Sequence, residues 1–120
     1  MTQISDDLMA WLGPAAEDLT AEQIEQVAVA ARDIAERYPD PDDSHLRDAA
    51  LSATVQYLLG DITAEDADRA LIEARQREQE AYAAALQVAV MLRGDGEQKA
   101  TAARRAGVAR MSLLKALGER

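Results

Sequence analysis

The clearest hydrophobic pattern along the chain lies between residues 20 and 38. Apolar side chains recur there at spacings of three and four residues, the period of one helix face, and charged side chains occupy the positions between them. Thr20 and Gln23 precede the run in the order of a capping box. The pattern predicts an amphipathic helix that ends before Pro39. Its apolar face consists of Ile24, Val27, Ala28, Ala31, Ile34, Ala35 and Tyr38.

Residues that are typical of helix starts and ends predict one further helix on each side of this helix. A short helix follows Ser5 and is stopped by Gly13 and Pro14. Another begins among residues 40–44, where several side chains suit an N-cap, and runs to about Leu59 with Gly60 at its end. Its expected inner face consists of Leu46, Ala49, Ala50, Ala53 and Tyr57.

The segment from Thr63 to Gly94 permits one long helix. Thr63 and Asp66 resemble a capping box, and no Gly or Pro follows before Gly94. Residues 75–80 are all polar, whereas residues 81–92 are apolar except for Gln87. This apolar run is too short to span a bilayer, so we expect a helix that is buried on most sides. The pattern leaves open whether residues 75–80 bridge two helical subdomains or break the helix.

Residues 95–118 predict two short helices joined at Gly107. Asp95 and Gln98 have the spacing of a cap for the first helix, and Gly107 can adopt the positive φ that ends it. Because no run alternates as a strand does, we expect an all-α chain. The residues that would pack the two helices together are Ala103, Val108, Leu113, Ala116 and Leu117.

This segment, from Lys99 to Gly118, resembles the helix-turn-helix of bacterial and phage repressors and of homeodomain-like bacterial regulators. The family pattern asks for a small residue, a glycine, a β-branched residue and two apolar residues. The chain supplies them as Ala103, Gly107, Val108, Leu113 and Leu117. With residues 81–92 as the additional helix, the resemblance covers residues 81–118 and says nothing about residues 1–70. Pattern and charge together predict an acidic helical region at 1–75 and a three-helix helix-turn-helix region at 76–120, and the resemblance implies that the second region binds double-stranded DNA.

The distribution of charge agrees with a polyanionic partner for the C-terminal region. The chain has a net charge of −9, yet residues 93–120 hold seven basic and three acidic groups, so the remainder carries −13. A phosphate-facing surface requires such a concentration of positive charge, whereas a structural αα-hairpin, the alternative interpretation, does not. The resemblance directs the second helix into the major groove, with Arg110 on guanine. Candidate DNA-binding residues are Lys99, Thr101, Arg104, Ala109, Arg110, Met111, Ser112 and Lys115.

Two residues fit the helix-turn-helix pattern poorly. Leu114 occupies a position that the family usually leaves polar, so this side chain could contact DNA or a partner. Glu97 would repel phosphates if it faced them, and it could instead stabilise the N-terminus of its helix.

Composition excludes most other chemistry. The chain has no cysteine and one histidine, and no arrangement of residues suits a nucleophile or a phosphate-binding loop, so we expect neither an enzyme nor a cofactor. Residues 40–48 hold an acidic cluster without the spacing of an EF-hand, which we expect to cap helices and to be solvated. The N-terminus lacks the pattern of a signal peptide, so we expect a cytoplasmic protein without a membrane association. The cluster consists of Asp40, Asp42, Asp43, His45 and Asp48.

The favoured function is that of a dimeric, sequence-specific transcriptional regulator. One helix-turn-helix contacts too few base pairs to find a site in a genome, so we expect a homodimer formed through residues 1–92. The stripe within residues 20–38 and the run at 81–92 are the candidate dimer surfaces, and burial inside one subunit is the alternative for both. The rival hypothesis is a protein-interaction adaptor that uses its acidic helical surface, and the acidic region is in either case a candidate surface for a protein partner.

Overall fold

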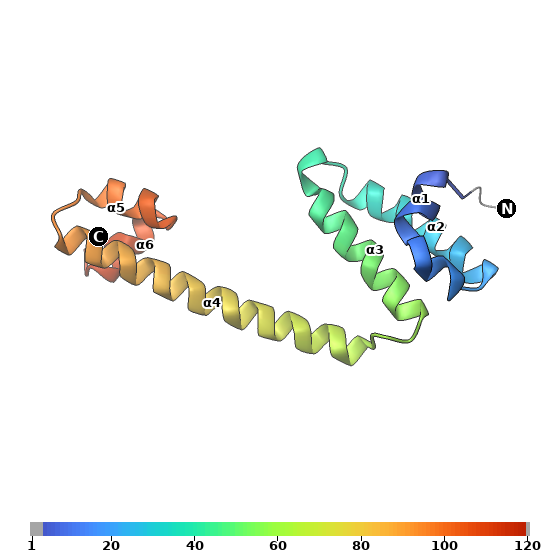
Figure 1. Cartoon of the computed structure of the whole chain (residues 1–120). Coiled ribbons are helices and arrows are strands. Elements are labelled where there is room, and N and C mark those ends of the chain that lie inside the picture. The colour runs from blue at the N-terminus through green and yellow to red at the C-terminus, as the bar shows by residue number, and fades with distance from the viewer. Residues whose placement is uncertain (1–3, 120) are drawn as a thin grey trace. The chain divides into compact units, whose positions relative to one another are not determined.

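The computed structural model describes residues 4–119, and within that range every regular element is a helix (Figure 1). The expectation of an all-α chain is therefore confirmed. The chain divides into two compact units, Met1–Ala67 and Asp68–Arg120. The sequence pattern had suggested a boundary later in the chain, between residues 75 and 76.

The first unit contains three α-helices whose starts follow their capping residues. They are α1 (Asp6–Leu12), α2 (Ala21–Arg37) and α3 (Ser44–Leu58), with 3₁₀ turns at Gly13–Glu17 and Pro41–Asp43. The Ser5 side chain accepts from the backbone N–H of Leu8 at 3.1 Å. Thr20 and Gln23 form both bonds of the predicted capping box, at 2.9 and 3.1 Å. The predicted beginnings of α1 and α2 are thus confirmed.

The apolar stripe of α2 provides much of the core of this unit. Val27, Ala28 and Ile34 are buried, as predicted, whereas Ala35 is exposed. The core cluster joins α1, α2 and α3 through Leu8, Leu12, Leu19, Val27, Ala28 and Val55. The α2 stripe is therefore covered within the unit, which removes it as a candidate dimer surface.

Hydrogen bonds hold α2 and α3 together at both ends. The Gln23 side-chain amide donates to the carbonyl of Leu58 at 3.1 Å. At the other end, the Arg47 guanidinium donates to the carbonyls of Tyr38 and Asp40 at 2.6 and 2.7 Å. The Asp40 carboxylate accepts from the N–H of Asp42, so its expected capping role is confirmed.

The predicted inner face of α3 is wrong. Leu46 is 39% exposed and Tyr57 is 67% exposed, whereas Leu51, Val55 and Leu58 contribute to the core. No charged residue occurs between positions 49 and 60, so α3 carries two apolar stripes that the pattern alone does not distinguish. The packing of α2 against one of them decides which stripe is inside.

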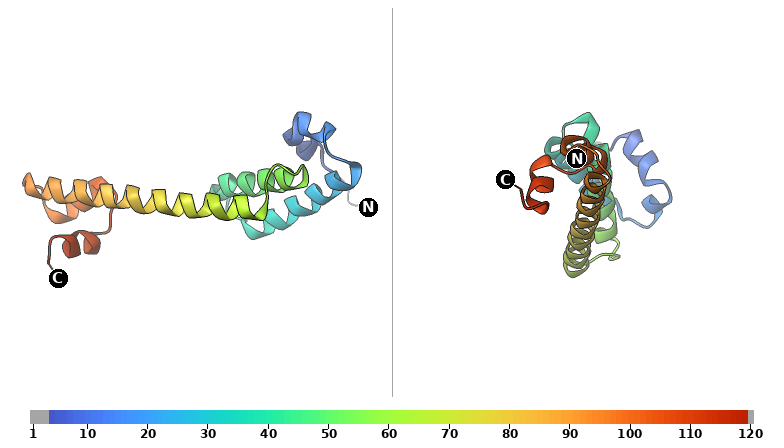
Figure 2. Two further views of the ribbon diagram at one scale, coloured as in Figure 1. Left: turned by 90° about the horizontal axis from the view of Figure 1, so that it is seen from below. Right: turned by 90° about the vertical axis from the view of Figure 1, so that its left-hand side faces the viewer.

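One uninterrupted helix, α4 (Ala64–Gly94), spans the polar stretch that had left two interpretations open (Figure 2). Its predicted capping box is confirmed, since Thr63 and Asp66 bond reciprocally at 3.0 and 3.1 Å. The expectation that residues 81–92 are buried on most sides is wrong. Ala89 alone is fully buried in α4, because α5 and α6 cover only one side of it; Val88 and Met91 are exposed.

The second unit is completed by α5 (Lys99–Ala106) and α6 (Arg110–Ala116) beside the C-terminal end of α4 (Figures 1 and 2). Its core contains Ala89, Ala102, Ala103, Val108 and Leu113. Across residues 4–119, no helix has both the length and the apolar content to cross a membrane.

The corrected inner face of α3 predicts unequal effects for two leucine substitutions. Leu51 packs on the core and Leu46 does not. We expect Leu51→Ala to lower the free energy of unfolding of this unit by about 2 kcal/mol, and Leu46→Ala by less than about 1 kcal/mol. Urea titrations followed by fluorescence of Trp11, which lies in α1, measure both losses. Equal losses, or a larger loss for Leu46→Ala, would contradict the observed face.

Candidate nucleic-acid interface

The turn between α5 and α6 has the predicted glycine at its centre. Gly107 has φ +76°, in the left-handed region that side chains with a Cβ rarely adopt. Its backbone N–H donates to the carbonyl of Arg104 at 3.2 Å, and the N–H of Val108 donates to the carbonyl of Ala103 at 3.0 Å. These two bonds form a Schellman motif, which ends α5 and sends the chain into α6.

Small side chains make up most of the buried core that the three helices of this unit share. Ala89 of α4 and Ala102 of α5 are both 0% exposed, and Ala103 is 2% exposed. Val108 and Leu113 are buried as predicted, and Leu117 is half-buried. Ala116 was expected to pack inward but is exposed, because the other side of α6 faces the core.

The predicted cap of α5 by Asp95 and Gln98 is wrong. Residues 95–97 instead complete the end of α4. Gly96 has φ +102° there, and its N–H donates to the carbonyl of Arg93 at 3.1 Å. The N–H of Glu97 donates to the carbonyl of Leu92 at 3.1 Å, and the two bonds together form a second Schellman motif. Gln98 is the N-cap residue of α5, and its side chain makes no capping bond.

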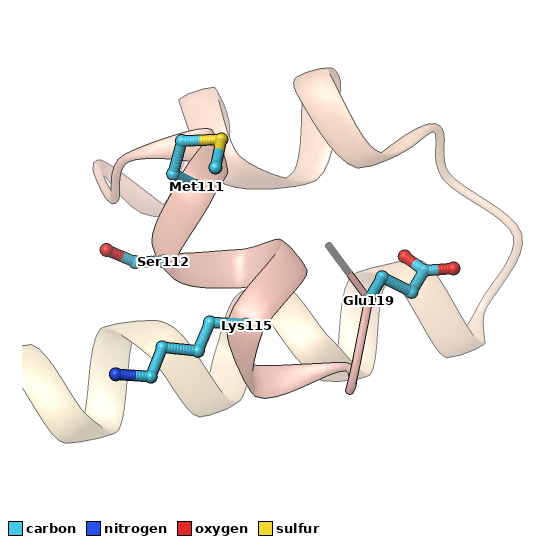
Figure 3. A pocket seen from close by; sticks show the side chains of 4 residues that line it. All are labelled: Met111, Ser112, Lys115 and Glu119. Atoms are coloured by element: carbon cyan, nitrogen blue, oxygen red, sulfur yellow. The ribbon is translucent and has the colours of Figure 1, made fainter.

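The exposed side of α6 carries most of the predicted base-reading residues. Met111 is 69% exposed, and Arg110 and Lys115 are also exposed. Ala109, the N-cap residue of α6, is exposed as well. Met111, Ser112, Lys115 and Glu119 line an open hollow, with Ser112 and Lys115 extending to the same side of α6 in Figure 3.

The basic side chains of the unit fall into two groups. Those of Arg104, Arg110 and Lys115 are exposed and make no hydrogen bond or ion pair with any residue between 4 and 119. By contrast, Lys99 pairs with Glu119 at 2.6 Å, and Arg105 pairs with Glu97. The first group is available to an external anion, whereas a phosphate would compete with a carboxylate for the second.

The remaining predicted residues are less accessible or have structural roles. Thr101 and Ser112 are half-buried, on α5 and α6 respectively. Leu114, the misfit of the family pattern, is also half-buried. Glu97 was expected to stabilise a helix N-terminus, but it binds Arg105, and its carbonyl accepts from Arg93 at 3.1 Å. Nothing in the local pattern indicated these pairs, because the partners come from different elements.

The described part of the chain contains no group of three or more His, Asp or Glu side chains that could hold a metal ion. The exposed guanidinium and ammonium groups of this unit could pair with an anion, and Met111 is an exposed apolar side chain on the same helix as Arg110 and Lys115.

The positive φ of Gly107 predicts which substitutions this position tolerates. Among the described residues, no atom beyond its chain neighbours lies within 4 Å of the place where its Cβ would be, so we assign the cost of substitution to the positive φ. We expect Gly107→Val to destabilise this unit by about 1–3 kcal/mol. Gly107→Asn should be much milder, because Asn tolerates left-handed backbone. Thermal unfolding by circular dichroism measures both losses, while Trp11 fluorescence should report an unchanged first unit. Similar losses for Val and Asn would contradict this explanation.

The chain matches no protein-family model, no curated protein and no solved structure. Its function is therefore inferred from its own residues, above all from the three cations on α5 and α6 that have no partner among residues 4–119 and from the exposed side chains next to them.

Proposed function

We propose that residues 81–118 form a helix-turn-helix unit that binds double-stranded DNA, and that the protein is a cytoplasmic, dimeric, sequence-specific transcriptional regulator. One observation carries the proposal. In a chain of net charge −9, Arg104, Arg110 and Lys115 are exposed on two small helices joined by a tight turn, and no partner for them occurs within residues 4–119. DNA affinity depends on such groups, because each phosphate contact releases condensed counterions.

In this proposal α6 is the recognition helix. Arg110 is its first residue, where side chains of a recognition helix reach base edges. Its guanidinium can donate two hydrogen bonds to O6 and N7 of a guanine, which no other base accepts in the same geometry. Met111 and Ala109 are exposed next to it and offer apolar contact to a thymine methyl group.

The other candidate residues suit the DNA backbone. Arg104 on α5 and Lys115 on α6 are exposed cations that can pair with phosphates on either side of the groove. Thr101 and Ser112 have hydroxyl groups that donate to phosphate oxygens. Lys99 begins α5 and can join them once it leaves Glu119. These contacts orient the protein, whereas the sequence is read by the residues at the start of α6.

Dimerisation is the second part of the proposal. The seven residues of α6 can reach only a few base pairs, which is too short a site to be distinctive in a genome. Two copies joined by a two-fold axis read two half-sites, and the free energies of the two contacts add.

We expect Arg110→Ala to reduce sequence discrimination without unfolding the protein. The side chain is exposed and unpaired, so its removal should leave stability unchanged and should cost about 1–3 kcal/mol of binding to a preferred duplex. The duplex is first selected from a random pool, and gel shifts then compare it with random DNA. Arg32→Ala, on an exposed position of α2, is the matched control and should bind as the native chain does.

The same experiment separates the alternatives. An equal loss on selected and random DNA would make Arg110 a phosphate contact. Full binding by the variant would remove Arg110 from the interface. If the native chain selects no duplex and binds none at low salt, the DNA-binding function is wrong and the protein-interaction adaptor takes its place.

The ion pair of Lys99 predicts a gain of affinity. We expect Glu119→Gln to raise DNA affinity a few-fold at low salt, because Lys99 is then free to contact phosphate, and the gain should shrink as salt rises. Glu36→Gln removes the same charge from the exposed side of α2 and is the matched control. An equal gain in the two variants would mean that net charge alone matters and that Lys99 has no part in binding.

A further inference from the structure

Residues 68–84 of α4 belong to the second unit but lie outside its buried core. Every residue from 68 to 84 is exposed. Helices in water depend mostly on burial of an apolar face, and a helix with no such burial is marginally stable. The exposed length of α4 therefore calls for a partner.

A continuous seam runs along α4 beside the region that α5 and α6 cover. Its positions alternate at spacings of four and three residues, the heptad spacing of a coiled coil. All of its residues are exposed, and one of them, Arg77, is charged. Val88 and Met91 are 53% and 58% exposed, which is unusual for large apolar side chains next to a core. The seam consists of Ala70, Ala74, Arg77, Ala81, Ala84, Val88 and Met91.

We propose that this seam, residues 70–91, pairs with the same seam of a second copy of the chain in an antiparallel two-stranded coiled coil centred at Gln79. The inference names the surface of the dimer in the proposed function and rests on that proposal for its biological use. In this register Ala74 lies opposite Ala84 of the second copy, and Ala70 lies opposite Val88. The small side chains allow the helix axes to approach to about 8 Å.

The charge of Arg77 selects the antiparallel arrangement. In a parallel pair in register, the two Arg77 side chains would occupy one layer of the core and repel each other. In the antiparallel pair, Arg77 lies opposite Ala81 of the second copy, whose small side chain leaves room for the guanidinium. Glu78 and Glu80 of the second copy flank that position and supply the opposite charge.

The same register sets the distance between the two proposed reading units, each formed by α5 and α6 of one copy. This distance is close to the spacing of two half-sites on one duplex. Ala89, which α5 and α6 cover, lies ten residues beyond Gln79, so the two copies of Ala89 are about 30 Å apart along the coil at 1.5 Å per residue. This distance is close to one turn of DNA, about 34 Å, which separates successive half-sites.

The rotation per residue along α4 determines the side of the coiled coil from which α5 and α6 project. Ala89 follows the seam residue Val88, so the covered side points about 100° away from Val88 around the helix axis. The two-fold axis of an antiparallel pair is perpendicular to the plane of the two helices. Both copies of α5 and α6 therefore project from the same side of the coil, as binding to one duplex requires.

Charge introduced into the seam tests the interface without DNA. We expect the native chain to be a dimer at micromolar concentration by light scattering, and Ala81→Arg to weaken the dimer at least about tenfold, since it sets a cation against Arg77 of the second copy. Ala83→Arg is the matched control, because Ala83 is exposed on another side of α4, and it should remain dimeric. Circular dichroism establishes that both variants keep their helices.

Cysteine pairing tests the direction of the helices, and the natural chain has no cysteine to interfere. Ala74→Cys and Ala84→Cys, mixed and treated with an added oxidant, should form disulfide-linked dimers of one copy of each. Either variant alone should form few, because Ala74 does not meet Ala74 in the antiparallel register. Gln76→Cys mixed with Ala83→Cys, on exposed positions outside the seam, is the control and should not crosslink efficiently.

Each outcome decides the inference. A monomeric native chain, a dimer unaffected by Ala81→Arg, or efficient crosslinking of Ala74→Cys with itself would overturn it. A dimer with the expected crosslinks supports it, and supports it equally if no DNA is bound, in which case the DNA-binding function fails and the interface stands.

Discussion

The second unit depends on a small buried core in which alanine side chains predominate. Ala89 of α4 meets a core that includes Ala102 and Ala103 of α5, and Leu113 is the largest side chain fully enclosed there. With so little side-chain volume, the helices cohere only if their axes lie close together. Helices of eight and seven residues are not stable by themselves, so the exposed side of α6 is held in place by this core.

Charge is divided between groups that hold the unit together and groups that face outward. Lys99 with Glu119 and Arg105 with Glu97 tie α5 to the segments before and after the two helices. Exposed pairs of this kind contribute little stability, but they occupy cations that would otherwise face solvent. The cations of Arg104, Arg110 and Lys115 have no such partner in residues 4–119, and they define the surface that an anion would meet.

The long helix α4 connects these properties with assembly. One side of its C-terminal part supports α5 and α6, while the seam beside it is exposed over its full length. Both surfaces belong to one continuous helix. The place where a partner binds along the seam therefore also sets where α5 and α6 lie relative to that partner. A continuous helix transmits that geometry, which a flexible linker in its place would lose.

The sequence by itself determined the helices, most of their ends and the turn at Gly107, because each depends on hydrogen bonds between residues a few positions apart. It also located the candidate side chains on α6. Only the tertiary structure decided that α3 faces the core with Leu51 rather than Leu46, that residues 81–92 are covered on one side, and that Lys99 is paired. These properties depend on neighbours from other elements. A helix with two apolar stripes, or a cation near several carboxylates, has alternatives of similar energy until packing selects one of them.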